Sequence, residues 1–159
     1  MKTGGSFAAA AFILIAAGTL SFQSGIGTYN SLNTEQDTLR KYQDGKYSGK
    51  SQADYTDEPY WGIVSFTLHQ DRFTGINFII RDSVLHEPFD SSYAKHFKDN
   101  EVYIEQCRND WRGVQSYPKK LMEIQNIDNL DAVSGATWSY NIFNAAVKDA
   151  LNKAKNKPE

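Results

Sequence analysis

Cysteine is nearly absent from this chain of 159 residues: Cys107 stands alone, so neither an intrachain disulfide nor a site with several thiolate ligands can form. The three histidines are scattered without the spacing of metal ligands, which gives no indication of a metal site. No strong excess of one charge exists either. The net charge is −2, and Lys and Arg are interleaved with acidic residues, which excludes the basic stripe of a nucleic-acid-binding protein.

Aromatic residues, in contrast, are plentiful, with nine Tyr, nine Phe and three Trp. Hydrophobic residues make up 40% of the chain and charged residues 23%, which is typical of a globular protein and suits one domain of ordinary size. The aromatics are numerous enough to line a groove for a flat ring, although we expect most of them in the core. We expect Cys107 to be a buried structural thiol.

The N-terminus has the features of an export signal. Lys2 precedes an apolar stretch over residues 7–22 with small residues behind it. This stretch is slightly shorter than the roughly 20 residues of a membrane span, so residues 1–22 are either a cleaved signal peptide or a membrane anchor. No cysteine follows the stretch, which excludes a lipoprotein anchor. We therefore expect an exported protein of the periplasm or cell envelope, which is either released or attached to the membrane through residues 7–22.

Residues 23–43 are polar and weakly periodic, and we interpret them as a linker with a short helix over residues 33–42. The turn signal Asp44-Gly45 predicts that a single folded domain begins there and spans residues 44–157. Residues 46–51 suit a first strand. Residues 61–70 and 73–81 alternate apolar with polar side chains around the turn Asp71-Arg72, which predicts two antiparallel strands.

The middle of the chain is less regular. Helical spacing occurs in pieces over residues 90–97 and 102–110, and Ser116 with Pro118 predicts the N-terminus of a helix that points Leu121, Met122 and Ile124 inward. Residues 130–133 suit a short strand. Apolar residues at three- and four-residue steps predict an amphipathic helix over residues 138–155. The expected fold is α+β, an antiparallel sheet with helices packed on one side.

The most informative motif joins the predicted strand at 130–133 to the last helix. It has the form D-x-x-S-G-A-T and places a threonine hydroxyl in the first turn of a helix, where backbone N–H groups can hold a phosphate. Its glycine permits strained dihedral angles and its alanine adds no bulk, while its serine can cap the helix or bond a phosphate oxygen. The candidate site residues are Asp131, Ser134, Gly135, Ala136, Thr137 and the adjacent Trp138.

This motif resembles the attachment sequence of the FMN-binding domain family, and the strands at 46–51, 61–70 and 73–81 resemble the opening of that domain. The resemblance spans residues 44–155 and implies that Thr137 carries FMN through a phosphoester bond. It also implies a separate flavin transferase, which takes FMN from FAD with a divalent metal ion. Asp131 belongs to the family motif. The implied protein is an electron carrier that passes electrons to a redox partner protein or a small acceptor.

Two other functions remain open at this stage: an exported module that binds a ligand or partner without redox chemistry, and the flavin subunit of a small-molecule reductase. No acid–base pair in the sequence supports a self-contained enzyme. If FMN is bound, its ring needs flat apolar partners. The candidates are Trp138 and Tyr140 beside the motif and Trp111, Arg112 and Tyr117 from the middle segment, with Arg108 and Arg112 as possible counter-charges.

Overall fold

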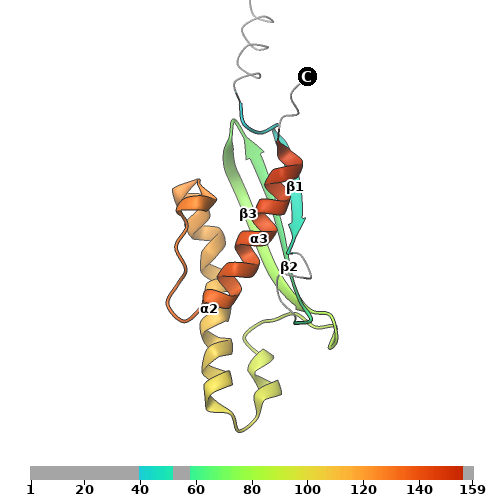
Figure 1. The fold of residues 1–159 in the computed structure, drawn as a ribbon, viewed down its shortest axis with the longest axis vertical. Helices are drawn as coiled ribbons and strands as arrows, with labels where there is room; N and C mark the ends of the chain where they lie inside the picture. The colour runs from blue at the N-terminus through green and yellow to red at the C-terminus, as the bar shows by residue number, and fades with distance from the viewer. Residues whose placement is uncertain (1–39, 52–57, 156–159) are drawn as a thin grey trace, which may run out of the picture.

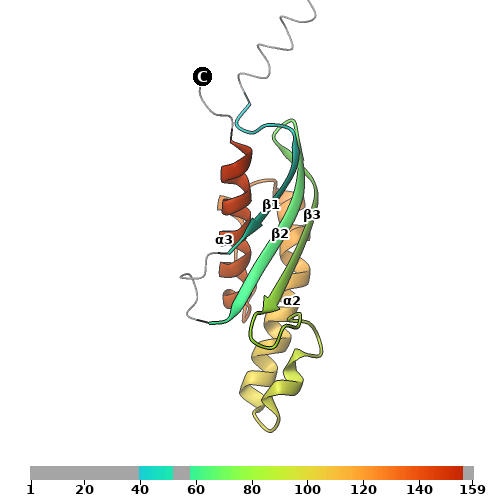
Figure 2. The same cartoon turned by 90° about the vertical axis from the view of Figure 1, so that its right-hand side faces the viewer.

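The computed structural model describes residues 40–51 and 58–155 (Figure 1). Three antiparallel strands follow in the order β1 (Gly45–Lys50), β2 (Tyr60–His69) and β3 (Arg72–Asp82). The remainder comprises the 3-10 turn η2 (Tyr93–Phe97), the helix α2 (Glu101–Ile124), the 3-10 turn η3 (Ile127–Asn129) and the helix α3 (Thr137–Ala154). Both helices cover one face of the sheet, and the expected α+β class is confirmed (Figure 2).

The three strands were predicted to within one residue at each end, because each has a buried and an exposed face. In β2, Val64, Phe66 and Leu68 point into the core. In β3, however, Phe73 and Phe78 are both buried although they are an odd number of residues apart. The register shifts beside Thr67 and Leu68, and this bulge reverses the alternation.

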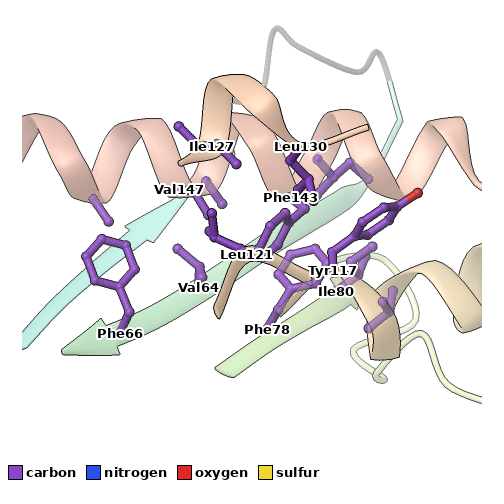
Figure 3. Close-up of a cluster of buried hydrophobic side chains, with 14 of the residues drawn as sticks. Val64, Phe66, Phe78, Ile80, Tyr117, Leu121, Ile127, Leu130, Phe143 and Val147 are labelled. Atoms are coloured by element: carbon purple, nitrogen blue, oxygen red, sulfur yellow. The ribbon is translucent and has the colours of Figure 1, made fainter. Parts of the chain in front are cut away.

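The core lies between the sheet and the two helices (Figure 3). Val64 and Phe78 of the sheet pack against Phe143 and Val147 of α3. Leu121 of α2 belongs to the same buried cluster. Phe143 contacts Phe78 edge to face, with 4.9 Å between the ring centroids. Such pairs add on the order of 0.5–1.5 kcal/mol beyond the area they bury. The predicted inner face of α3 is confirmed, since every residue assigned to it is buried: Phe143, Val147, Ala150, Leu151 and Ala154.

The predicted helix start at Ser116 is wrong, because α2 runs unbroken through Ser116 and Pro118 from its cap at Asn100. The Asn100 side chain accepts from the Tyr103 amide and so takes the capping role expected of Ser116. Pro118 lacks an N–H for the carbonyl one turn earlier, and α2 tolerates this defect within its packed interior. Ile124, predicted to point inward, lies at the exposed end of the helix.

The predicted strand at residues 130–133 does not form; η3 and an irregular segment occupy this region. Two tyrosines bind its backbone in place of a neighbouring strand. The Tyr140 hydroxyl donates to the Leu130 carbonyl at 2.9 Å, and the Val133 amide donates to the Tyr117 hydroxyl at 3.1 Å. Backbone N–H and C=O groups that are removed from water need hydrogen-bond partners. The two tyrosines provide them here, where a neighbouring strand would provide them in a sheet.

The described chain enters and leaves at the same end of the molecule (Figures 1 and 2). Tyr42 forms an isolated bridge with Lys155, and the Gln43 amide donates to the Ala154 carbonyl at 2.8 Å. The predicted signal or anchor at 7–22 lies outside the described residues, as does the predicted helix at 33–42 except for its last three positions, which are not helical. Within the described part of the chain, no helix is long and apolar enough to cross a membrane.

Candidate functional site

The D-x-x-S-G-A-T motif forms a tight turn that leads directly into α3. Gly135 adopts a φ of +75°, in the left-handed region that favours glycine, and the Ala136 amide donates to the Val133 carbonyl at 2.9 Å. Thr137 is the first residue of α3, and its side chain is exposed. The amides of Thr137 and Trp138 have no acceptor among the described residues. They are the free donors of a helix N-terminus, beside an accessible hydroxyl.

One stripe of α2 holds this turn in place. Gln106, Asp110, Gly113 and Tyr117 follow at steps of three and four residues and therefore share one face of the helix. The Gln106 side-chain amide donates to the Gly135 carbonyl at 3.1 Å, and the buried Tyr117 hydroxyl donates to the Ala136 carbonyl at 2.8 Å. Burial raises the pKa of Tyr117, which keeps its hydroxyl protonated.

Asp110 caps α3 from the neighbouring helix. Its side chain is only 2% exposed, and one carboxylate oxygen accepts from both the amide and the hydroxyl of Ser139, at 3.0 and 2.8 Å. The residue at the N-cap position, Ala136, has no side-chain acceptor. Gly113 allows the close approach, because a Cβ there would lie 2.5 Å from the Ser139 hydroxyl oxygen. The negative charge of Asp110 also lies near the positive end of the helix dipole.

An aromatic pocket opens beside the start of α3. Trp138 forms one wall, where its ring meets those of Tyr60 and Phe89 at centroid distances of 5.1 Å, and its indole N–H donates to Glu58 at 2.8 Å. Phe97 and Tyr103 stack against each other at 5.3 Å. The pocket has a volume of about 230 Å³, and its lining comprises Glu58, Tyr60, Phe89, Phe97, Tyr103, Gln106, Cys107, Asp110 and Trp138.

Cys107 is buried as predicted, and it reaches the wall of this aromatic pocket. Burial and the nearby Asp110 raise the pKa of its thiol. The protonated thiol is a poor nucleophile, so Cys107 serves the pocket as a small apolar wall residue.

A second, polar hollow lies against the other side of the motif turn. Val133, Ser134 and Gly135 form one border, and the α2 side chains of Arg112 and Lys120 supply positive charge. Arg112 also donates to Asn109 on the preceding turn of its helix. The motif therefore borders this polar hollow, while Trp138, the residue directly after the motif, lines the aromatic pocket.

A buried hydrogen-bond chain behind the aromatic pocket was not predicted from the sequence. The Tyr60 and Tyr93 hydroxyl oxygens are 2.9 Å apart, and the Tyr93 hydroxyl donates to Asp82 at 2.5 Å. Burial acts to raise the pKa of Asp82, but the bonds from Tyr93 and from the Leu85 and Val84 amides outweigh it and hold the pKa below its ordinary value. No local pattern links these residues, since β2, β3 and η2 supply one each.

The predicted site residues differ in exposure: Asp131, Ser134, Gly135 and Thr137 are exposed, Trp138 is half-buried, and Ala136 is buried. Thr137 and Trp138 face the exterior and the aromatic pocket respectively. Ser134 is not the helix cap, because α3 begins two residues later than that role requires. Ala136 is fully buried against α2, where only a small side chain fits beside Gly113.

Of the other ring candidates, Tyr117 and Tyr140 are committed to the backbone of the motif segment, and Arg112 lies at the polar hollow. Neither Trp111 nor Arg108 is among the residues that line the aromatic pocket. The signal that sequence reasoning lacked is the position of residues 89–97, which include η2 and bring Phe89 and Phe97 to the same pocket as Trp138 from a region of the chain with weak periodicity.

Comparison with known proteins decides the family. The sequence model described as the FMN-binding domain matches residues 57–152, which is more than half of the chain. The chain belongs to the FMN-binding domain family. It is accordingly a flavin-binding protein, as the resemblance of its motif predicted.

Among solved structures, the FMN-binding domain described here is similar to the CPE2226 protein of Clostridium perfringens, with a TM-score of 0.55 and 20% identity over 71% of this chain and 88% of the other. At that identity the likeness concerns the fold alone. No curated protein sequence matches the chain significantly.

The residues of this FMN-binding domain fit the group that its family implies. The two amides without acceptors at Thr137 and Trp138 can receive phosphate oxygens. The aromatic pocket is smaller than the roughly 300 Å³ at which pockets for whole drug-sized ligands begin, so it suits a ring system and not an entire nucleotide. Within the described part of the chain, no group of His, Cys, Asp and Glu could hold a metal ion.

Proposed function

We propose that the protein is an exported flavoprotein that carries FMN covalently on the Thr137 hydroxyl and transfers electrons outside the cytoplasm. The observation that carries this proposal is the exposed hydroxyl at the first residue of α3, beside two amides without acceptors. The family membership supports FMN as the group. The apolar residues 7–22 support export or membrane attachment.

The attachment exchanges one phosphorus–oxygen bond for another. The Thr137 oxygen forms a bond to the FMN phosphorus, the pyrophosphate bond of FAD breaks, AMP leaves, and the hydroxyl proton passes to a base. Since no group of described residues could hold the metal ion, we assign both the metal ion and the base to a separate flavin transferase. The protein contributes an accessible hydroxyl on a rigid turn.

The helix N-terminus then stabilises the product. The phosphodiester keeps one negative charge, which gains about 0.3–1 kcal/mol from the helix dipole. The Thr137 and Trp138 amides donate to its oxygens. Covalent attachment also prevents loss of the cofactor by dilution outside the cell.

We place the flavin ring in the aromatic pocket, because Trp138 joins that pocket to the attachment residue within one turn of α3. The ring, when bound, supplies the capacity to accept and donate one or two electrons. Tyr60, Phe89 and Trp138 hold it by apolar contact and limit its access to water. The redox partner is a second protein or a small acceptor.

Co-expression with a flavin transferase tests the proposal. After denaturing electrophoresis the wild-type band is expected to fluoresce, and its mass to increase by one FMN less one water. Thr137→Ala removes the oxygen and abolishes both signals, whereas Thr137→Ser restores them. Ser134→Ala, a matched loss of a neighbouring exposed hydroxyl, leaves the covalent flavin in place. Covalent flavin that persists in Thr137→Ala contradicts the proposal.

The aromatic pocket also supports an alternative, a ligand-binding module without redox activity, because its five aromatic side chains offer contact to any flat apolar ring. Native protein purified from its host envelope separates the two functions. A mass that includes FMN, together with reduction and reoxidation of the bound flavin by partner extracts, supports the carrier. An unmodified chain supports the binding module.

A further inference from the structure

The charged residues that line the aromatic pocket are all acidic. Glu58 and Asp110 border it with carboxylates, and none of the described residues in its lining is Lys, Arg or His. The donors nearest to the pocket are already used: the Trp138 indole N–H bonds Glu58, and the Gln106 amide bonds Asp110 at 2.5 Å. The pocket therefore offers negative charge and hydrogen-bond acceptors.

The tyrosine chain behind the pocket has a fixed direction. Because the Tyr93 hydroxyl donates its only proton to Asp82, its oxygen can only accept from Tyr60. Tyr60 thus donates its only proton to Tyr93, and its hydroxyl can act toward any further group only as an acceptor. The Asp82 carboxylate is fixed by two backbone amides and adds a third negative charge two hydrogen bonds behind the wall.

We propose that the aromatic pocket binds planar rings that are neutral or positively charged and excludes anionic rings, with Glu58 as the main determinant of this charge selectivity. Five aromatic side chains supply contacts that are insensitive to charge or favour cations. Glu58 is exposed at the rim of the pocket, where solvent screens part of its charge, whereas the carboxylate of Asp110 is buried and less screened; both repel an anion at close range. The identification of the natural occupant as the flavin ring rests on the proposed function; the selectivity itself does not.

Three tricyclic probes test the selectivity in the unmodified protein, purified from a host without the flavin transferase. Proflavine is a cation at neutral pH, lumiflavin is neutral, and anthracene-9-carboxylate is an anion. Fluorescence polarisation of proflavine gives its dissociation constant, and displacement gives the other two. We expect proflavine and lumiflavin to compete for one site, and the anion to bind at least tenfold more weakly than the cation.

Glu58→Gln removes one charge and keeps an oxygen that can accept from Trp138, so the fold is retained. It is expected to reduce the ratio of anion to cation dissociation constants several-fold. Glu105→Gln is the matched control, since Glu105 lies at the polar hollow and not at the aromatic pocket. Equal binding of anion and cation to the wild type, an unchanged ratio in Glu58→Gln, an equal effect of Glu105→Gln, or no binding of any probe each overturns the proposal.

A readout on the flavin-loaded protein follows from the same charges. Reduction by a low-potential donor adds two electrons to the ring, with protons taken from solvent, and nearby carboxylates oppose any net negative charge that remains. Glu58→Gln is therefore expected to shift the midpoint potential to a more positive value, and Glu105→Gln to leave it unchanged. A more negative potential in Glu58→Gln contradicts the selectivity even where fluorescence on the denaturing gel has established the covalent flavin.

Discussion

At the scale of single residues, Asp110 is the group on which the geometry of the motif depends most. It is buried on α2, yet both groups that it binds on Ser139 belong to α3, so it joins two helices and orients the first turn of the second. Thr137 lies within that turn, and no hydrogen bond joins it to α2 among the residues that the structure describes. The exposed hydroxyl is thus positioned by a side chain that does not contact it.

Replacement of Asp110 tests this role. Asp110→Ala leaves the Ser139 amide buried without an acceptor, which is expected to lower the free energy of unfolding by about 1–3 kcal/mol. Asp110→Asn keeps one acceptor oxygen and is expected to cost less. Urea unfolding measures both. Asp131→Ala, an exposed motif carboxylate, is the control and should stay within about 0.5 kcal/mol of the wild type. Equal stability of Asp110→Ala and Asp131→Ala would show that the cap is unimportant.

At the scale of elements, the close contact between α2 and α3 depends on a glycine, Gly113, which has no side chain to separate the two helices. A Cβ at Gly113 would lie 2.5 Å from the Ser139 hydroxyl oxygen and 2.9 Å from the Ala136 Cβ, both on a rigid turn. Gly113→Ala is therefore expected to destabilise the protein by about 1–3 kcal/mol, the usual cost of overpacking.

Gly75→Ala is the matched control in β3, where a Cβ would meet nothing within 4 Å. It is expected to be neutral or slightly stabilising. Thermal unfolding monitored by circular dichroism measures the stability of both variants. Gly113→Ala is also expected to make the motif turn, which packs against Gly113, more sensitive to proteolysis. A neutral Gly113→Ala variant would mean that the two helices can separate without loss of stability.

The sequence predicted the strands and α3 because the burial of each follows a simple period, and the three strands in addition pair with their neighbours in the chain. It did not predict an unbroken α2, since Pro118 and Ser116 favour a helix start locally while packing against β3 and α3 favours continuation. The aromatic pocket was out of reach for a different reason. The pocket brings together Phe89, Phe97 and Trp138 only in the folded domain, and no short sequence pattern predicts that these residues are neighbours.

At the scale of the whole molecule, acid is expected to weaken the fold. Several carboxyl groups have pKa values below their ordinary range. For Asp82 and Asp149, burial acts to raise the pKa, but hydrogen bonds from Tyr93 and Lys153 respectively outweigh it; for Asp44, the bond from the Gln70 amide lowers the pKa first. Groups of this kind stabilise the folded state above their unfolded pKa, near pH 4, and lose that contribution as the pH falls through their folded values.

The free energy of unfolding is therefore expected to be nearly level between pH 7 and 5 and to fall below about pH 4. Urea unfolding at several pH values measures this profile. Asp82→Asn is expected to reduce the slope below pH 4, because that group no longer titrates. A slope that is identical in Asp82→Asn and the wild type would assign the acid sensitivity to other carboxyl groups.

The bridge between Tyr42 and Lys155 has a consequence for how such a domain can be used within longer polypeptides. Because the two ends of the described domain are neighbours, residues 40–155 could be inserted as a unit into a single surface loop of another protein. Thr137 begins a helix that ends at this junction, so about 27 Å of helix separates them, at 1.5 Å per residue. A membrane or a further domain attached where Tyr42 and Lys155 meet therefore lies a whole helix length away from Thr137 and leaves it accessible to a modifying enzyme.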